Sequence, residues 1–157
     1  MTDDQKRPDT KVTLDQQVCF AIYGAAHAFN RTYKPLLEPL GLTYPQYLVM
    51  MTLWEKDGLT VKEIGEKLGL DSGTLSPLLK RLEQAGRIEK RRADDDERQV
   101  LVTLTEGGRA LQPESARIMQ AIGAAAGCPV GELVELRERL KALTSNLENA
   151  ELATGER

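Results

Sequence analysis

A change of hydrophobic period near Gly86 is the feature that most constrains the fold of this chain. Upstream of it, apolar residues recur at steps of three and four, which is typical of one helix face. Downstream, residues 88–92 and 100–104 have strand character, and the second run is rich in β-branched side chains. The charged segment 93–99 separates the two runs. The sequence therefore predicts a β-hairpin with a charged tip directly after a helical region.

Two short helices are predicted immediately before this hairpin. Residues 60–63, Thr-Val-Lys-Glu, form a capping box that opens the first helix, and Gly69 ends it. Asp71 is a good N-cap for the second helix. Pro77 removes one backbone hydrogen bond inside this helix, so we expect a slight bend or well-packed first two turns there. Two helices joined by a tight glycine-containing turn indicate a helix-turn-helix, and the following hairpin makes it a winged helix.

Helices are also predicted on the N-terminal side of this unit. A helical pattern begins at Thr13, is expected to break at residues 30–32, and resumes as far as Leu37. Thr43 then caps a helix that runs to about Glu55 and carries a proline in its first turn, where proline is tolerated.

Two more helices are predicted on the C-terminal side. One covers residues 109–126, and the last begins near Pro129. The last helix has an apolar seam with coiled-coil-like spacing, made of Leu133, Leu136, Leu140, Leu143 and Leu147. Because the winged helix already has a complete core, we expect the flanking helices to pair with a second copy. A two-fold dimer would place two reading helices on successive turns of a palindromic DNA site.

The predicted fold class is therefore mainly α with a small β-hairpin wing, and both termini supply a helical dimerisation region. The chain of 157 residues divides into five predicted segments. These are a disordered N-terminus (1–12), N-terminal helices for sensing and dimerisation (13–57), the winged helix-turn-helix (58–106), C-terminal dimerisation helices (107–150) and a tail (151–157).

Composition limits the function classes. No apolar run is long enough to span a bilayer, and the polar residues 1–11 do not resemble a secretory signal, so we expect a soluble, cytoplasmic protein without membrane contact. The net charge of −3 argues against nucleic-acid binding through the whole surface. Residues 79–92, however, contain six basic and two acidic side chains, which predicts a local basic footprint.

Candidate DNA-reading residues lie on the second helix of the motif, whose N-terminal part faces base edges in such proteins. They are Ser72, Thr74, Ser76, Lys80 and Arg81. Asp71 is interpreted as a helix cap, because a carboxylate that faces phosphates is repelled. For Arg81 the alternative to a DNA contact is an ordinary solvated charge.

The hairpin tip carries one further candidate, Arg98. An arginine at a wing tip can enter the minor groove, and Asp96 is expected to hold its guanidinium in a bidentate pair. The alternative is a solvated cluster of charges, which the neighbouring acidic residues also fit.

Two stretches resemble a known family. Asp96-Glu-Arg-Gln-Val-Leu-Val-Thr-Leu-Thr-Glu-Gly-Gly108 resembles the wing region of the MarR family of dimeric winged-helix regulators. Leu70-Asp-Ser-Gly-Thr-Leu-Ser-Pro-Leu-Leu-Lys-Arg-Leu82 is similar to the organic hydroperoxide resistance regulator branch, OhrR. The resemblance extends from about Leu14 to Leu147.

Cys19 is the candidate sensor. By itself, a lone helical cysteine is more often a small buried core residue, although Tyr23 lies one turn away, where its phenol can donate a hydrogen bond to a thiolate. The resemblance to OhrR implies a reactive cysteine at this place. It also implies that Tyr23, Tyr33 and Tyr44 surround the sulfur, two of them from the partner subunit, whereas Tyr47 is interpreted as packing.

Cys128 is the second thiol. It precedes Pro129 at the start of a helix, and a helix N-terminus favours an anionic sulfur. The resemblance to two-cysteine OhrR proteins implies an intersubunit disulfide with oxidised Cys19. The alternative is an unreactive thiol, with a small-thiol mixed disulfide or overoxidation at Cys19 instead. Two cysteines and one histidine do not make a zinc site, so no metal or cofactor is expected. The residues interpreted as core or interface are His27, Met50, Met51 and Trp54.

The predicted function is that of a redox-sensing repressor rather than an enzyme. The reduced homodimer binds double-stranded operator DNA, represses a peroxide-detoxifying gene and releases the DNA when an organic hydroperoxide oxidises Cys19. One alternative is a MarR-type regulator that responds to a small aromatic ligand without thiol chemistry. Another is a thiol peroxidase, which would have no use for a wing.

Overall fold

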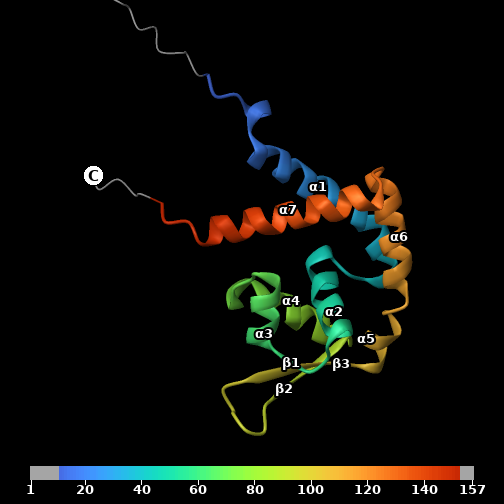
Figure 1. Ribbon diagram of the computed structural model, residues 1–157. Helices are drawn as coiled ribbons and strands as arrows, with labels where there is room; N and C mark the ends of the chain where they lie inside the picture. The colour runs from blue at the N-terminus through green and yellow to red at the C-terminus, as the bar shows by residue number, and fades with distance from the viewer. Residues whose placement is uncertain (1–10, 153–157) are drawn as a thin grey trace, which may run out of the picture. The chain divides into compact units, whose positions relative to one another are not determined.

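The computed structural model describes residues 11–152, which form two compact units. One unit ends at Pro113 and the other begins at Glu114 (Figure 1). Most of the predicted disordered N-terminus and tail lies outside the described residues. Within the described residues, no helix is long and apolar enough to cross a membrane, and no cluster of His, Cys, Asp and Glu could hold a metal ion.

The first long helix, α1, spans Val18–Leu37 after a single 3₁₀ turn at Leu14–Gln16. The break that the sequence predicts at residues 30–32 is therefore wrong. These residues are polar, but polarity alone does not end a helix, and here they continue its regular backbone. Thr32 even donates its hydroxyl to the Ala28 carbonyl, 2.9 Å away, as helical Thr commonly does.

Helix α2 spans Tyr44–Glu55 and begins where the sequence predicts. The Thr43 hydroxyl accepts from the Gln46 backbone N–H at 3.4 Å, and the Gln46 side chain accepts from the Thr43 N–H at 3.0 Å. This reciprocal box satisfies two N–H groups that would otherwise lack a partner at the helix start. A 3₁₀ turn at Glu38–Leu40 connects α1 to this helix.

The helix-turn-helix consists of α3, Val61–Leu68, and α4, Ser72–Gln84. The predicted capping box at Thr60 is confirmed, and Gly69 ends α3 in the left-handed conformation with φ of 66°. The Asp71 carboxylate accepts from the Thr74 backbone N–H at 2.7 Å, so its predicted role as N-cap is confirmed. Because this hydrogen bond stabilises the charged form, the pKa of Asp71 is lowered.

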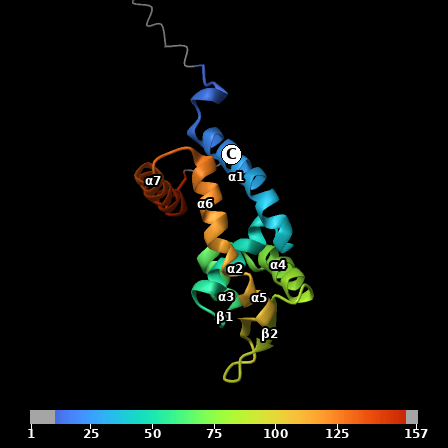
Figure 2. The ribbon, with the colours of Figure 1, turned by 90° about the vertical axis from the view of Figure 1, so that its right-hand side faces the viewer.

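A three-stranded antiparallel sheet completes the winged helix, in the order β1-β3-β2. Strands β2, Ile88–Arg92, and β3, Val100–Leu104, have the predicted bounds. Their connecting loop projects from the sheet in both views (Figure 1 and Figure 2). Strand β1, Leu59–Thr60, was not predicted, because two residues are too few to show an alternating pattern.

The hydrophobic core of this first unit lies among α2, α3, α4 and the sheet. Its largest fully buried side chains come from all of these elements. They include Met50, Leu53, Ile64, Leu75, Leu79, Leu82, Ile88 and Val102. The winged helix therefore buries its own apolar faces within a single chain.

The helices after the wing differ from the prediction of one helix over 109–126. Helix α5 spans Glu106–Ala110, a turn follows, and α6 spans Glu114–Ala126. The missed signal is Pro113, which lacks an N–H donor and disfavours helical geometry in the residue before it. The last helix, α7, spans Val130–Glu148 and starts directly after Pro129, as predicted.

Candidate functional site

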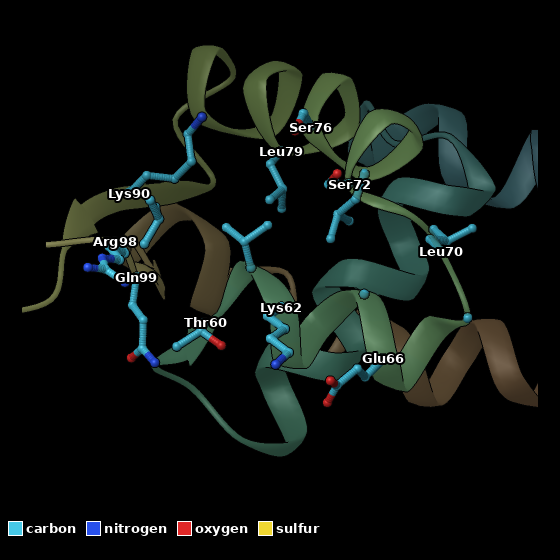
Figure 3. Close-up of a pocket in the computed structure, with 15 residues that line it drawn as sticks. Thr60, Lys62, Glu66, Leu70, Ser72, Ser76, Leu79, Lys90, Arg98 and Gln99 are labelled. Atoms are coloured by element: carbon cyan, nitrogen blue, oxygen red, sulfur yellow. The ribbon is translucent and has the colours of Figure 1, made fainter. Parts of the chain in front are cut away.

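A groove of about 770 Å³ lies between α3, α4 and the wing (Figure 3). Its floor is apolar and includes Val61, Leu75, Leu79 and Val100. Ser72 and Ser76 of α4 line one side, and side chains from the start of α3 line the other (Figure 3). Arg98 at the wing completes the lining. Three of the predicted DNA-reading residues thus meet in one concave surface.

The other three candidates on α4 are distributed around the helix. At about 100° per residue, Lys80 continues the flank that Ser72 and Ser76 occupy, one turn further along. Thr74 and Arg81 lie two turns apart on the opposite flank. All five side chains are exposed. Helix α4 therefore presents two polar flanks, and these can face the two walls of a DNA groove.

Several groove residues were not selected from the sequence. Lys62 and Glu66 of α3 and Lys90 and Gln99 of the wing line the same surface (Figure 3). The four-residue spacing of Lys62 and Glu66 indicates that they share one face of α3. Only the tertiary structure shows that this face lines the groove together with α4 and the wing. Lys90 is part of the predicted basic stretch.

The basic stretch 79–92 does not act as a single surface. The Arg87 guanidinium is directed inward and donates to the Leu40 carbonyl at 3.5 Å. The backbone N–H of Lys90 donates to the Glu83 carboxylate at 3.2 Å, and its Nζ lies 3.8 Å from the same group. Arg87 is thus structural, whereas Lys90 is anchored at the edge of the groove.

The wing tip differs from the predicted pairing of Asp96 with the Arg98 guanidinium. The Asp96 carboxylate instead accepts from the Arg98 backbone N–H at 3.0 Å, which is the short-range turn geometry that aspartate favours. The Arg92 guanidinium donates to the Glu97 carbonyl at 2.9 Å across the loop. Among residues 11–152, none of the ion pairs involves Arg98. Asp96 therefore shapes the turn and leaves the Arg98 guanidinium available.

Cys19 and Tyr23 lie one turn apart on α1, and both are exposed in the single chain. Within its own chain, Cys19 is therefore not the small buried core residue that a lone helical cysteine would most often be. Tyr23 makes an edge-on ring contact with His27, with centroids 4.4 Å apart and an interplanar angle of 70°. Cys19, Tyr23 and His27 thus follow one another along the same side of α1.

The other two predicted sensor tyrosines form a separate cluster. The Tyr33 and Tyr44 ring centroids are 4.5 Å apart, and Tyr47 lies 6.0 Å from Tyr33 and 6.0 Å from Trp54. Burial, with smaller contributions from the charges of Tyr44 and Tyr47, raises the pKa of Tyr33 to about 12. Burial also raises the pKa of Tyr44. Both phenols are therefore protonated at neutral pH and can donate a hydrogen bond.

The single chain does not bring this cluster to Cys19. Tyr33 follows Cys19 by 14 residues on the same uninterrupted helix. At 1.5 Å per residue this corresponds to about 21 Å along the helix axis. A contact between the Cys19 sulfur and the Tyr33 phenol therefore requires a second chain.

Cys128 lies in the second unit, between Gly127 and the Pro129 that begins α7. Its thiol is exposed and donates to the Ala126 carbonyl at 3.3 Å. The residue precedes the N-cap, so its sulfur stands just outside the first turn of the helix.

The family model described as "Transcriptional regulator SarA/Rot" matches residues 31–114, which is more than half of the chain. The organic hydroperoxide resistance transcriptional regulator of Bacillus subtilis is 44% identical over 134 residues, covering 85% of this chain and 91% of that protein. The chain belongs to the MarR family, in its OhrR branch. A second relative, the HTH-type transcriptional regulator TtmR of Methylorubrum extorquens, is 48% identical over 139 residues and covers 88% of this chain and 71% of that protein.

Solved structures of the regulator AbfR of Staphylococcus epidermidis are similar to this OhrR-branch chain. Reduced AbfR bound to DNA is 38% identical with a TM-score of 0.73, and the match covers 87% of this chain and 95% of that one. Disulfide-formed AbfR is 40% identical with a TM-score of 0.61, covering 83% and 92%. The predicted winged-helix fold and the assignment to transcription regulators are confirmed.

Proposed function

We propose that this MarR-family regulator is a repressor that senses organic hydroperoxides through Cys19. The observation that supports it most is the exposed Cys19 thiol one helical turn from Tyr23, in a chain 44% identical to an organic hydroperoxide resistance regulator. In this proposal the reduced dimer occupies a palindromic operator, and oxidation releases it.

The proposed chemistry has two balanced steps. The Cys19 thiolate attacks one peroxide oxygen, the O–O bond breaks, and the products are a sulfenic acid at Cys19 and an alcohol. The Cys128 thiol of the partner subunit then attacks the Cys19 sulfur, which forms a disulfide and releases water. Exposed apolar side chains next to Cys19, including Phe20 and Ile22, favour an alkyl hydroperoxide over hydrogen peroxide.

The sensor is complete only in a dimer. If Cys19 of each chain meets Tyr33 of the other, two-fold symmetry places the midpoint of the two residues, near Ala26, at the symmetry axis. Four of the five residues 24–28, Gly-Ala-Ala-His-Ala, have small side chains, and these lie where the two copies of α1 would approach most closely. On either side of Ala26, exposed apolar residues of α1 such as Val18 and Phe29 supply apolar surface for the same contact between the two copies.

The Ala26→Cys variant in a chain without the native thiols tests this arrangement. Two sulfurs near a two-fold axis can approach within disulfide geometry. Mild oxidation is expected to give a covalent dimer on a non-reducing gel. A matched cysteine at Ala21, on the same helix but away from the midpoint, should remain monomeric on that gel. Equal cross-linking at both positions would contradict the proposed crossing point.

We assign DNA reading to the two flanks of α4 and to the wing. Ser72, Ser76 and Lys80 are proposed to contact one wall of the major groove, and Thr74 and Arg81 the other. The Arg98 guanidinium is proposed to enter the minor groove, and the turn that Asp96 stabilises directs it. Lys62 and Lys90, at the rim of the groove, would bind phosphates.

Oxidation can reach these residues through packed helices of the first unit. Helix α1 contacts α2, and α2 contacts both α3 and α4. A disulfide from Cys19 to the partner subunit's Cys128 would pull on α1. Because α2 is packed between α1 and the reading helix, this movement would change the separation of the two copies of α4 and weaken operator binding.

Operator binding with and without an alkyl hydroperoxide tests the function. The wild-type protein is expected to release DNA on oxidation and to show an intersubunit disulfide on a non-reducing gel, whereas Cys19→Ser should remain bound. Cys128→Ser should still lose its Cys19 thiol but form no intersubunit disulfide. If Cys19→Ser releases DNA as readily as the wild type, the sensor function is wrong.

A further inference from the structure

His27 is a titratable residue beside the sensor thiol to which the chemistry above gives no role. It is the single histidine of the chain, and the sequence suggests no more than a place in a core or interface. In the structure it is exposed, and its ring packs edge-on against Tyr23 at 4.4 Å. Tyr23 is 62% exposed. Among residues 11–152, His27 is the only aromatic ring in contact with it.

The direction of side chains on a helix gives this contact a consequence. Each Cα–Cβ bond tilts toward the N-terminus, so a long side chain covers the turn before its own residue. Tyr23 is therefore directed toward Cys19, and His27, on the next turn toward the C-terminus, is directed toward Tyr23. By this geometry, the ring contact with His27 lies on the side of Tyr23 that faces away from Cys19.

We propose that His27 is a positioning residue for the sensor, which holds the Tyr23 phenol toward the Cys19 sulfur. The inference rests on the proposed sensor function and adds a residue to it. An exposed tyrosine on a helix exchanges between side-chain rotamers, and an edge-on aromatic neighbour at an angle of 70° restricts this exchange. More of the population then presents the phenolic donor where the thiolate and the sulfenate need it.

The rate at which a hydroperoxide consumes the Cys19 thiol tests the proposal. The background is the full-length Cys128→Ser chain, so that the remaining thiol reports Cys19 alone, and cumene hydroperoxide is the probe. His27→Ala is expected to slow the reaction by about two- to tenfold, as expected for the loss of one aromatic pair. His27→Phe retains a ring at the same place and should restore most of the rate. Arg31→Ala, one turn further along α1, is the matched control and should leave the rate unchanged.

A double-mutant cycle separates positioning from general packing. Tyr23→Phe retains the ring but removes the hydroxyl group, so there is no donor left to direct. In that background His27→Ala should have no further effect on the rate, whereas a purely structural residue would slow the reaction by the same factor in both backgrounds. Additive effects, or a His27→Phe variant as slow as His27→Ala, would overturn the proposal.

The outcome is distinguishable from failure of the sensor function itself. If the Cys128→Ser chain does not lose its thiol to cumene hydroperoxide at all, and Cys19→Ser releases operator like the wild type, then the proposed function is wrong. If Cys19 reacts and controls the operator but the His27 variants react at the wild-type rate, only the positioning role is wrong.

Discussion

The winged helix and the long helices that flank it differ in how far a single chain completes them. In the winged helix, Ile64, Leu79 and Val102 are at most 1% exposed. In α1, Leu37 alone of twenty residues is buried, and α7 has no buried residue. The winged helix is therefore complete within one chain, whereas α1, which carries Cys19, and α7 leave apolar side chains exposed.

This difference fits the proposed function as a switch, which has two tasks. A reading surface must keep its side chains in one arrangement, and a self-contained core does this. A sensor must instead bias an equilibrium between arrangements, and interfaces between subunits can repack at lower cost than cores. If Cys19 of one chain meets Tyr33 of the other, as proposed, the sensor chemistry lies at such an interface.

Leu79→Ala is expected to have the largest effect, because it creates a cavity in the self-contained core. The side chain is 1% exposed, and truncation of a buried leucine typically costs about 2–5 kcal/mol of unfolding free energy. Urea unfolding at several protein concentrations measures it. The loss should be the same at each concentration, since the core belongs to one chain. A loss of unfolding free energy that depends strongly on protein concentration would contradict a core that one chain completes.

Leu136→Ala, on the seam of α7, is the matched truncation in the incomplete region. The side chain is 52% exposed in the single chain, so its loss removes no core, and we expect it to remove surface that a second copy covers. We expect a smaller loss of about 1 kcal/mol per subunit, expressed as weaker dimerisation. Analytical ultracentrifugation over a dilution series measures it, with operator binding in parallel. An effect on the monomer alone would show that α7 packs within its own chain.

The smallest expected effect is a change in stability at alkaline pH. The pKa of Tyr33 is raised to about 12, so the fold favours the neutral phenol. Its contribution to stability is fully present below the unfolded pKa of about 10 and is lost as the pH rises toward 12. Across this window, the unfolding free energy of the wild type should fall relative to that of Tyr33→Phe as the pH rises. A constant difference would contradict the raised pKa.

Much of the winged helix could be predicted from local sequence. The caps at Thr43, Thr60 and Asp71 and the bounds of β2 and β3 depend on neighbours within a few residues. Such signals are local because one side chain satisfies one nearby backbone group. The resemblance to OhrR then indicated which cysteine to consider as the sensor.

Other features depended on contacts between distant residues. Arg87 lies in a basic stretch, yet its guanidinium is bound to the Leu40 carbonyl far away in sequence. The continuity of α1 through residues 30–32 was hidden by their polarity, although it sets the distance from Cys19 to Tyr33.

The sequence by itself determined the winged helix, its helix caps and the two thiols, because each has a local pattern or a residue type that marks it. The tertiary structure decided which side chains share the groove between α3, α4 and the wing. It also decided that Tyr33 lies too far along α1 to reach the Cys19 of its own chain. The physical reason is that a groove and a helix length are properties of the packed backbone. Local sequence patterns therefore do not predict them.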